Sequence, residues 1–113
     1  MNLRLRLQEL DKLLQVVERG NKELAREYSI KARRYMMDAF PMDYRERLCE
    51  SSEEFATVFL WMRRFHFVCS CSPKSEFGNK YREELGKDWR IELIKNRSKH
   101  LRDAIGHVLK LYF

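Results

Sequence analysis

The sequence is poor in cysteine, glycine and proline, and none of these residues forms a known motif. Its three cysteines are an odd number without a secretory leader, which predicts reduced thiols and a cytoplasmic location, with the nucleus as the alternative. The four glycines are isolated from one another, so no glycine-rich loop can cradle a phosphate. The two prolines, Pro41 and Pro73, interrupt the apolar periodicity and predict breaks between helices.

Long apolar runs are also missing. The longest extends from Phe55 to Met62 and stops at Arg63, whereas a membrane-spanning helix needs roughly 20 apolar residues. The first ten residues, MNLRLRLQEL, contain no continuous apolar core of the kind found in secretory signals. We therefore expect no membrane span, and a length of 113 residues predicts one domain over 1–113.

Charge is abundant. Charged residues make up 35% of the chain, and 23 lysines and arginines against 17 acidic residues give a net charge of +6. This excess favours acidic partners, either nucleic acid or an acidic protein surface. The alternative is an ordinary charged surface that keeps the protein in solution.

Apolar residues near the start of the chain recur with helical spacing. They form a seam of alternating three- and four-residue steps: Leu3, Leu7, Leu10, Leu14 and Val17. The seam predicts an amphipathic helix with a partner along one stripe, and a homo-oligomer through Leu3, Leu7, Leu10 and Leu14 is one such arrangement. At Gly20 and Asn21 the pattern breaks, which favours a tight helical hairpin over one long helix.

A second helix is expected up to Pro41, with its apolar side made by Ala25, Tyr28, Ala32, Tyr35, Met36 and Ala39. A short helix follows, and then Ser51 and Glu54 form a capping box that starts a helix at Phe55. Aromatic and aliphatic residues cover almost the whole circumference of 55–68. This predicts the most buried helix, placed at the centre of the bundle.

Two more helices are expected in the last third of the chain. Ser72 and Pro73 suit the start of one, which ends at Gly86, and Asp88 can cap the other. The sequence therefore predicts an all-α fold, a compact bundle of about five helices around an aromatic-rich central helix.

Metal and catalytic sites find little support. Cys49, His66, Cys69 and Cys71 are metal-ligand types, but their spacing does not match the paired knuckles of zinc modules. No nucleophile–base pair is recognisable. We expect no cofactor, no required metal and no enzymatic activity.

Basic residues recur in pairs and clusters. The candidate partner-binding residues are Arg33, Arg34, Arg63, Arg64, Lys95, Arg97, Lys99 and Arg102. Lys95, Lys99 and Arg102 share a helix face that could follow a line of phosphates. Arg63 and Arg64 mark the strip where the aromatic helix meets solvent or a partner, and each is expected to extend to the surface or pair with an acid. An ordinary solvated face is the competing interpretation.

The order of elements resembles the ordered part of paramyxovirus C proteins, small basic accessory proteins read from a frame that overlaps the phosphoprotein gene. The resemblance rests on the leucine-rich helix, the break at DAFP, the aromatic helix EEFATVFLWMRRF, the Ser-Pro loop and the charged last helix. It implies a non-enzymatic role in host-cell cytoplasm: regulation of viral RNA synthesis, antagonism of interferon signalling and binding of a viral ribonucleoprotein or host signalling proteins. Two alternatives remain, a direct nucleic-acid binder such as a viral silencing suppressor, and an oligomerising scaffold module.

Overall fold

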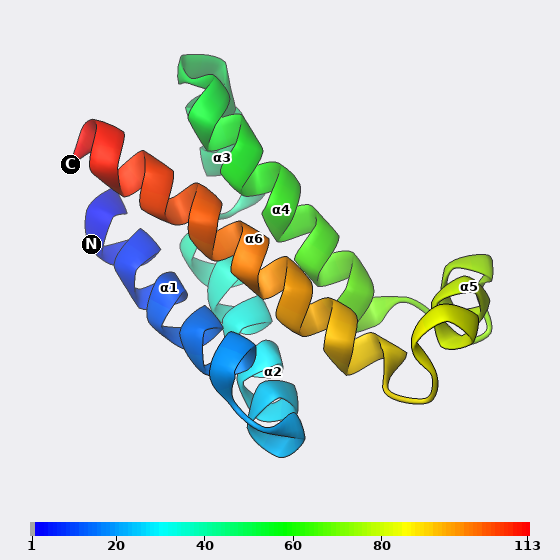
Figure 1. The fold of residues 1–113 in the computed structure, drawn as a ribbon. Coiled ribbons are helices and arrows are strands. Elements are labelled where there is room, and N and C mark those ends of the chain that lie inside the picture. Colours follow the sequence, from blue (N-terminus) through cyan, green and yellow to red (C-terminus); the bar gives the residue numbers. More distant parts are fainter. Residues whose placement is uncertain (1) are drawn as a thin grey trace.

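The computed structural model describes residues 2–113, which form six helices and no strands (Figure 1). The helices are α1 (Leu3–Arg19), α2 (Lys22–Ala39), α3 (Met42–Ser51), α4 (Glu53–Ser70), α5 (Glu76–Leu85) and α6 (Trp89–Tyr112). The predicted all-α class is confirmed, with six helices in place of about five. Within residues 2–113 there is no helix of the length and hydropathy needed to cross a membrane.

The predicted hairpin between the first two helices is confirmed. The Gly20 amide closes α1 on the Val16 carbonyl at 2.8 Å. Asn21 then begins α2 as its N-cap, with its side-chain oxygen accepting from the Leu24 amide at 2.9 Å. The chain therefore turns sharply enough to lay α2 against α1.

Two predicted helix starts are wrong in detail, and a third has the right position but lacks the side-chain cap. Ser52, not Ser51, caps α4 by accepting from the Phe55 amide, because Ser51 still belongs to α3. Ser75, not Ser72, caps α5, because a turn at Ser72 precedes the helix. Asp88 precedes α6 but makes no side-chain cap, since its carboxylate pairs with Lys22 instead.

The centre of the bundle is α6 and not the aromatic helix α4. Helix α6 contacts α1, α2, α4 and α5, whereas α4 contacts α2, α3 and α6 (Figure 1). Helix α4 buries a single face, made by Phe55, Val58, Phe59, Met62, Phe65 and Val68. Leu60 and Phe67 on its other side are exposed. The sequence predicted 55–68 as the central helix because apolar residues cover almost its whole circumference. Leu60 and Phe67, two of these residues, lie on the surface of the bundle, so the prediction is wrong.

The leucine seam of α1 is used inside the chain. Leu7, Leu10 and Leu14 have no exposed surface, because α2 and α6 cover that face of α1. The structure gives no support to the predicted homo-oligomer through Leu3, Leu7, Leu10 and Leu14, since three of these side chains already pack inside the chain.

Candidate binding groove between α2, α3 and α4

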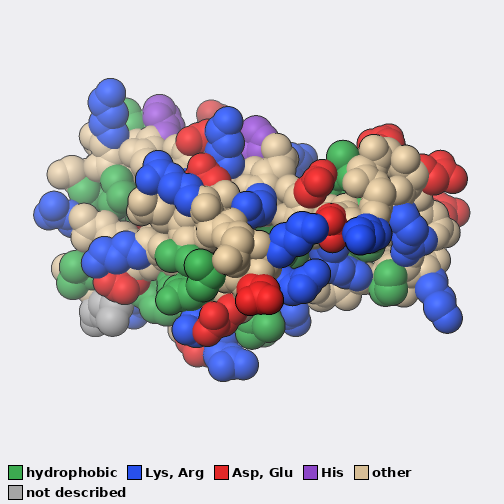
Figure 2. All heavy atoms as spheres, turned by 60° about the horizontal axis from the view of Figure 1, so that its bottom comes forward, with side chains coloured by type: hydrophobic (Ala, Val, Ile, Leu, Met, Phe, Trp, Pro, Cys, Tyr) green, Lys and Arg blue, Asp and Glu red, His purple; other side chains and the backbone are tan. Residues whose placement is uncertain are grey.

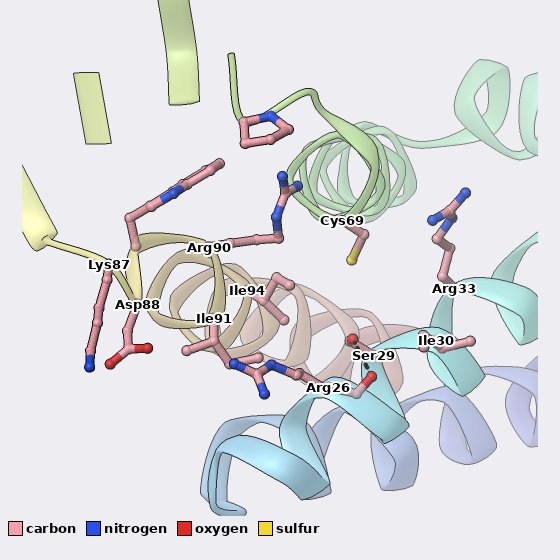
Figure 3. Close-up of a pocket in the computed structure, with 12 residues that line it drawn as sticks. Arg26, Ser29, Ile30, Arg33, Cys69, Lys87, Asp88, Arg90, Ile91 and Ile94 are labelled. Carbon is pink, nitrogen blue, oxygen red and sulfur yellow. Dashed lines mark hydrogen bonds between the residues drawn. The ribbon is translucent and has the colours of Figure 1, made fainter. Parts of the chain in front are cut away.

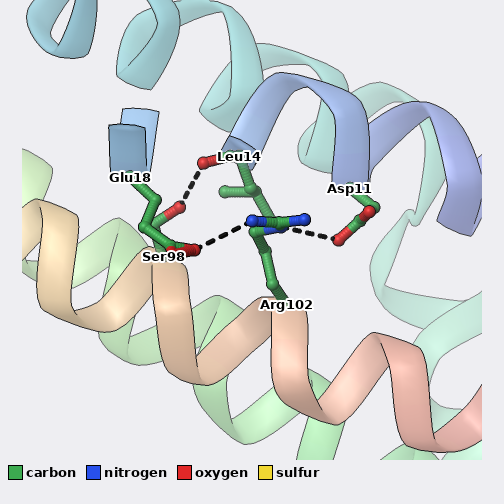
Figure 4. Close-up of polar contacts among 5 residues, drawn as sticks. All are labelled: Asp11, Leu14, Glu18, Ser98 and Arg102. Carbon is green, nitrogen blue, oxygen red and sulfur yellow. Dashed lines mark hydrogen bonds and ion pairs between the residues drawn. The ribbon is translucent and has the colours of Figure 1, made fainter. Parts of the chain in front are cut away.

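One residue of the predicted basic stripe on α6, Arg102, stabilises the fold and does not face a partner. Arg102 lies between α6 and α1, where its Nε is 3.0 Å from Asp11 Oδ1 and its Nη1 is 2.9 Å from Glu18 Oε1 (Figure 4). One turn away, buried Ser98 donates to the Leu14 carbonyl at 2.8 Å. Arg102 is thus neutralised by α1 and is not available to phosphates.

Of two more predicted binding arginines, Arg97 joins helices to one another and Arg64 packs on its own helix. The Nη1 of Arg97 donates to the Arg64 carbonyl at 2.9 Å, and its guanidinium lies over the Phe77 ring. The Arg64 guanidinium lies 4.6 Å from the centre of the Trp61 ring, an ordinary cation–π contact. Burial lowers the pKa of Arg97. The Arg97 contacts join α6 to α4 and α5, whereas Arg63 and Arg64 are both exposed on α4, as expected.

Arg33, Arg34 and Arg63 are different. None of them takes part in an ion pair within residues 2–113, although acidic side chains pair with lysines and arginines elsewhere. Of the two arrangements expected for Arg63, the structure has the first, because Arg63 is exposed and forms no ion pair within residues 2–113. Lys95 is half-buried and Lys99 is exposed on α6, and neither lines a cavity that these three arginines line.

A series of neighbouring cavities runs along α2, α3 and α4, and we call it the α2–α4 groove. Two cavities flank Ile30 and Arg33, with volumes of about 480 and 260 Å³. Two more lie beside Met42 and Arg63, with volumes of about 340 and 620 Å³. The residues shared between neighbouring cavities are Ile30, Arg33, Met37, Met42, Arg45 and Arg63. Because each cavity shares residues with the next, they form one continuous surface.

One end of the groove lies where α2, α4 and the start of α6 meet (Figure 3). Arg90 is fixed there, because its Nη1 donates to the Val68 carbonyl at 2.7 Å and caps the end of α4. Asp88 is neutralised by Lys22. The hydrogen bond from Lys22 lowers the pKa of Asp88, and the nearby charges of Lys87 and Arg26 lower it further. Arg26 and Arg33 form no ion pair within residues 2–113, and the cations around Asp88 outnumber it, so this end of the groove is electropositive.

Methionines form the apolar floor of the middle of the groove. Met36, Met37, Met42 and Met62 all line one cavity, and they are all the methionines between residues 2 and 113. Met36 and Met62 are buried, whereas Met37 is 56% and Met42 is 68% exposed. Flexible thioether side chains are common on binding surfaces that adapt to their ligand.

The positive charges of the groove act on one another. Arg45 is fixed by hydrogen bonds from its Nε and Nη2 to the Phe40 and Met36 carbonyls, which close the end of α2. Burial lowers the pKa of Arg45, and the charge of Arg63 lowers it further. Burial likewise lowers the pKa of His66, with Arg33 and Arg45 adding to the effect. Placing these positive charges close together costs electrostatic free energy, and an anionic ligand would reduce this cost.

Acidic side chains are few along the groove. Seven lysines and arginines line its four cavities against three acids, Glu46, Glu50 and Asp88. Asp88 is already paired, and the two glutamates lie at the α3 end. Figure 2 shows basic side chains spread over one face with hydrophobic patches between them, and acidic side chains both among them and at the right-hand end. The charge of the groove is therefore predominantly positive.

The four candidate metal ligands noted in the sequence, Cys49, His66, Cys69 and Cys71, do not come together as a metal site. Residues 2–113 contain no group of three or more His, Cys, Asp or Glu side chains that could hold a metal ion. Burial raises the pKa of the Cys69 thiol to about 11 and also raises the pKa of Cys49. Both thiols are thus protonated at neutral pH and weak as nucleophiles.

Sequence reasoning missed the methionines, Arg26, Arg45 and Ile30. One signal was present: Ile30 and Met37 are apolar, seven residues apart and outside the buried stripe expected for α2. These two residues flank Arg33 and Arg34 and are exposed, so α2 has a second apolar face outside the core. The joint surface of Met36, Met37, Met42 and Met62 gave no signal in the sequence, since these residues come from three helices.

Comparisons with protein-family models, with curated proteins and with solved structures find no match to this chain.

Proposed function

We propose that this protein is a non-enzymatic binding protein that holds an acidic polypeptide in the α2–α4 groove. The observation that supports this most is the combination of the methionine floor with Arg26, Arg33 and Arg63, three cations without acidic partners. An acidic ligand with apolar side chains would satisfy both features at once.

The same combination favours a polypeptide over nucleic acid. A duplex presents charged phosphates and sugar, which need lysines and arginines but leave an apolar floor without a partner. Met37 and Met42 would remain exposed beside a phosphate backbone. A protein segment can cover them with its own apolar side chains.

The resemblance to paramyxovirus C proteins would place this binding in the regulation of viral RNA synthesis or of interferon signalling. On that hypothesis the acidic polypeptide belongs to the viral ribonucleoprotein or to a host signalling protein. The groove is the surface through which we expect such an interaction.

A matched pair of charge reversals tests the proposal. The groove variant is Arg33→Glu with Arg63→Glu, and the control is Lys95→Glu with Lys99→Glu, which changes the net charge equally. Fluorescence anisotropy measures binding of a labelled glutamate–leucine peptide and of a short RNA duplex over a salt series. We expect the groove variant to lose at least about tenfold in peptide affinity, as when close interfacial charge pairs are broken, and the control to stay within about twofold.

Two results would contradict the proposal. One is peptide binding that falls equally in both variants, which would mean a response to net charge alone. The other is tight RNA binding that the control variant abolishes, which would assign the function to the α6 face. Circular dichroism confirms that each variant retains its helical content before binding is compared.

A further inference from the structure

We infer that the segment held in the α2–α4 groove is an amphipathic α-helix with acidic flanks, which packs as an additional helix of the bundle. This inference rests on the proposed function and specifies the shape and side-chain pattern of the partner.

The shape of the groove is the first reason. Helices α2 and α4 contact each other, and two of the cavities are lined by residues from both of them. The other two extend this surface, one along α2 and one between α3 and α4. Two packed helices leave a groove between them that accepts the ridge of side chains from a third helix. The bundle already uses this arrangement elsewhere, since α6 contacts both α1 and α2.

The second reason is the partner's own backbone. Residues 2–113 contain no strand, so an extended peptide finds no sheet edge to join. Laid over methionine side chains, the peptide would leave many of its N–H and C=O groups without partners. A helix satisfies these groups internally and can present apolar side chains to the floor.

The spacing of residues along α2 gives the pattern of the partner. Ile30, Arg33 and Met37 follow one another on the outer face, and Ile30 and Met37 are 57% and 56% exposed. Seven residues of helix rise about 10.5 Å. The matching ligand carries apolar residues at i, i+3, i+4 and i+7, with Asp or Glu beside them to meet Arg33, Arg34 and Arg63.

The methionine floor sets how selective the groove is. Methionine has no branch at Cβ and changes rotamer easily, so the floor can adapt to leucine, isoleucine or phenylalanine. Selectivity between ligands then comes from the arginines of the groove, which favour acidic residues on both flanks of the ligand helix and disfavour lysine or arginine there.

Three peptides of about five helical turns test the inference by isothermal titration calorimetry against the full chain. The first is a hydrocarbon-stapled helix of leucine and glutamate with leucines on one stripe. The second has the same sequence except that prolines replace two central residues, and it carries no staple. The third is stapled and has the same composition as the first, with the leucines scattered around the helix. We expect the first peptide to bind at least about tenfold more tightly than either of the others, because it alone is preorganised and matched in pattern.

The variants Met37→Glu and Leu111→Glu show where on the protein the peptide binds. Both side chains are exposed, so neither change removes a core contact, and Leu111 lines none of the cavities of the groove. Met37→Glu should reduce the affinity of the stapled stripe peptide by at least about tenfold, and Leu111→Glu should leave it unchanged.

Each other outcome overturns a defined part of the account. If the proline peptide binds as tightly as the stripe peptide and Met37→Glu weakens both, the groove binds acidic polypeptides but the helical partner is wrong. If no peptide binds, the proposed function fails as well. If light scattering shows a dimer of the protein alone that Met37→Glu dissociates, the occupant is a second copy and the inference is wrong.

Discussion

The Nε of Arg102 donates a hydrogen bond to the Asp11 carboxylate at 3.0 Å and thereby joins α6 to α1, the last helix to the first. Other arginines have comparable internal roles. Arg6, Arg82 and Arg90 each donate to a backbone carbonyl near the end of a helix or in a loop. Much of the positive charge that the composition assigns to partner binding therefore stabilises the bundle, whereas Arg33, Arg34 and Arg63 of the α2–α4 groove form no ion pair within residues 2–113.

Replacing Arg102 should destabilise the protein. Arg102→Ala leaves Asp11 and Glu18, which are partly buried, without their cation. We expect a loss of about 2 kcal/mol in the free energy of unfolding, as for hydrogen bonds to charged groups. Chemical denaturation measures it, with exposed Lys99→Ala as the control that changes stability by less than about 0.5 kcal/mol. Equal effects of the two variants would show that Arg102 is only a surface charge.

The two helical glycines Gly78 and Gly106 should respond to alanine with opposite signs. A Cβ added at Gly106 meets no atom within 4 Å, so Gly106→Ala should stabilise the protein by about 0.5–1 kcal/mol through helix propensity. A Cβ at Gly78 would lie 2.8 Å from the Pro73 carbonyl oxygen, a backbone atom that cannot swing aside. Gly78→Ala should therefore destabilise by about 1–3 kcal/mol. Thermal unfolding that shifts in the same direction for both variants would contradict the packing of the Pro73 loop on α5.

Phe59 should be a major contributor to stability. Its ring is 4% exposed and packs against Phe40 with the ring centres 5.9 Å apart. Phe59→Ala should cost about 3–5 kcal/mol by opening a cavity. Leu60→Ala, next to it on the exposed side of α4, should cost less than about 1 kcal/mol. Similar denaturation midpoints for the two variants would mean that α4 buries a different face.

His66 should make stability depend on pH. Its pKa is lowered in the folded state by burial and by Arg33 and Arg45, so the unfolded chain takes up the proton more readily. The free energy of unfolding should therefore fall as the pH drops through the ordinary histidine pKa of about 6.5, and level off below the lowered pKa of the folded state. Denaturation between about pH 7.5 and 5 should show a smaller fall in His66→Gln. Identical profiles of the variant and the parent would show that folding does not lower the pKa of His66.

The helices themselves were predictable because their signals are local. The leucine spacing of α1 and the Gly20–Asn21 break are visible in the sequence, and the structure contains both. The cap positions were missed because adjacent serines compete, and only the path of the chain decides between Ser51 and Ser52. Local pattern thus gives the elements but leaves their ends uncertain by a few residues.

The groove could not be predicted because it depends on contacts between distant residues. Arg102 and Asp11 are 91 positions apart, and nothing near Arg102 in the sequence separates it from Lys99. The methionines become one surface only when α2, α3 and α4 pack together. Which arginines are neutralised, and which apolar residues are left exposed, is decided by packing alone.

The methionine methyl groups allow the most direct measurement of the central claim, that the α2–α4 groove binds an acidic polypeptide. Protein labelled with ¹³C at these methyls is titrated with the stapled glutamate–leucine helix and followed by NMR, with the resonances of Met36, Met37, Met42 and Met62 assigned by single substitution to leucine. All four side chains line one cavity, and Met37 and Met42 are the more exposed. We predict saturable shifts that are largest for Met37 and Met42 and that disappear in Arg33→Glu with Arg63→Glu. If the peptide binds while these methyl resonances do not move, the α2–α4 groove is not the binding site.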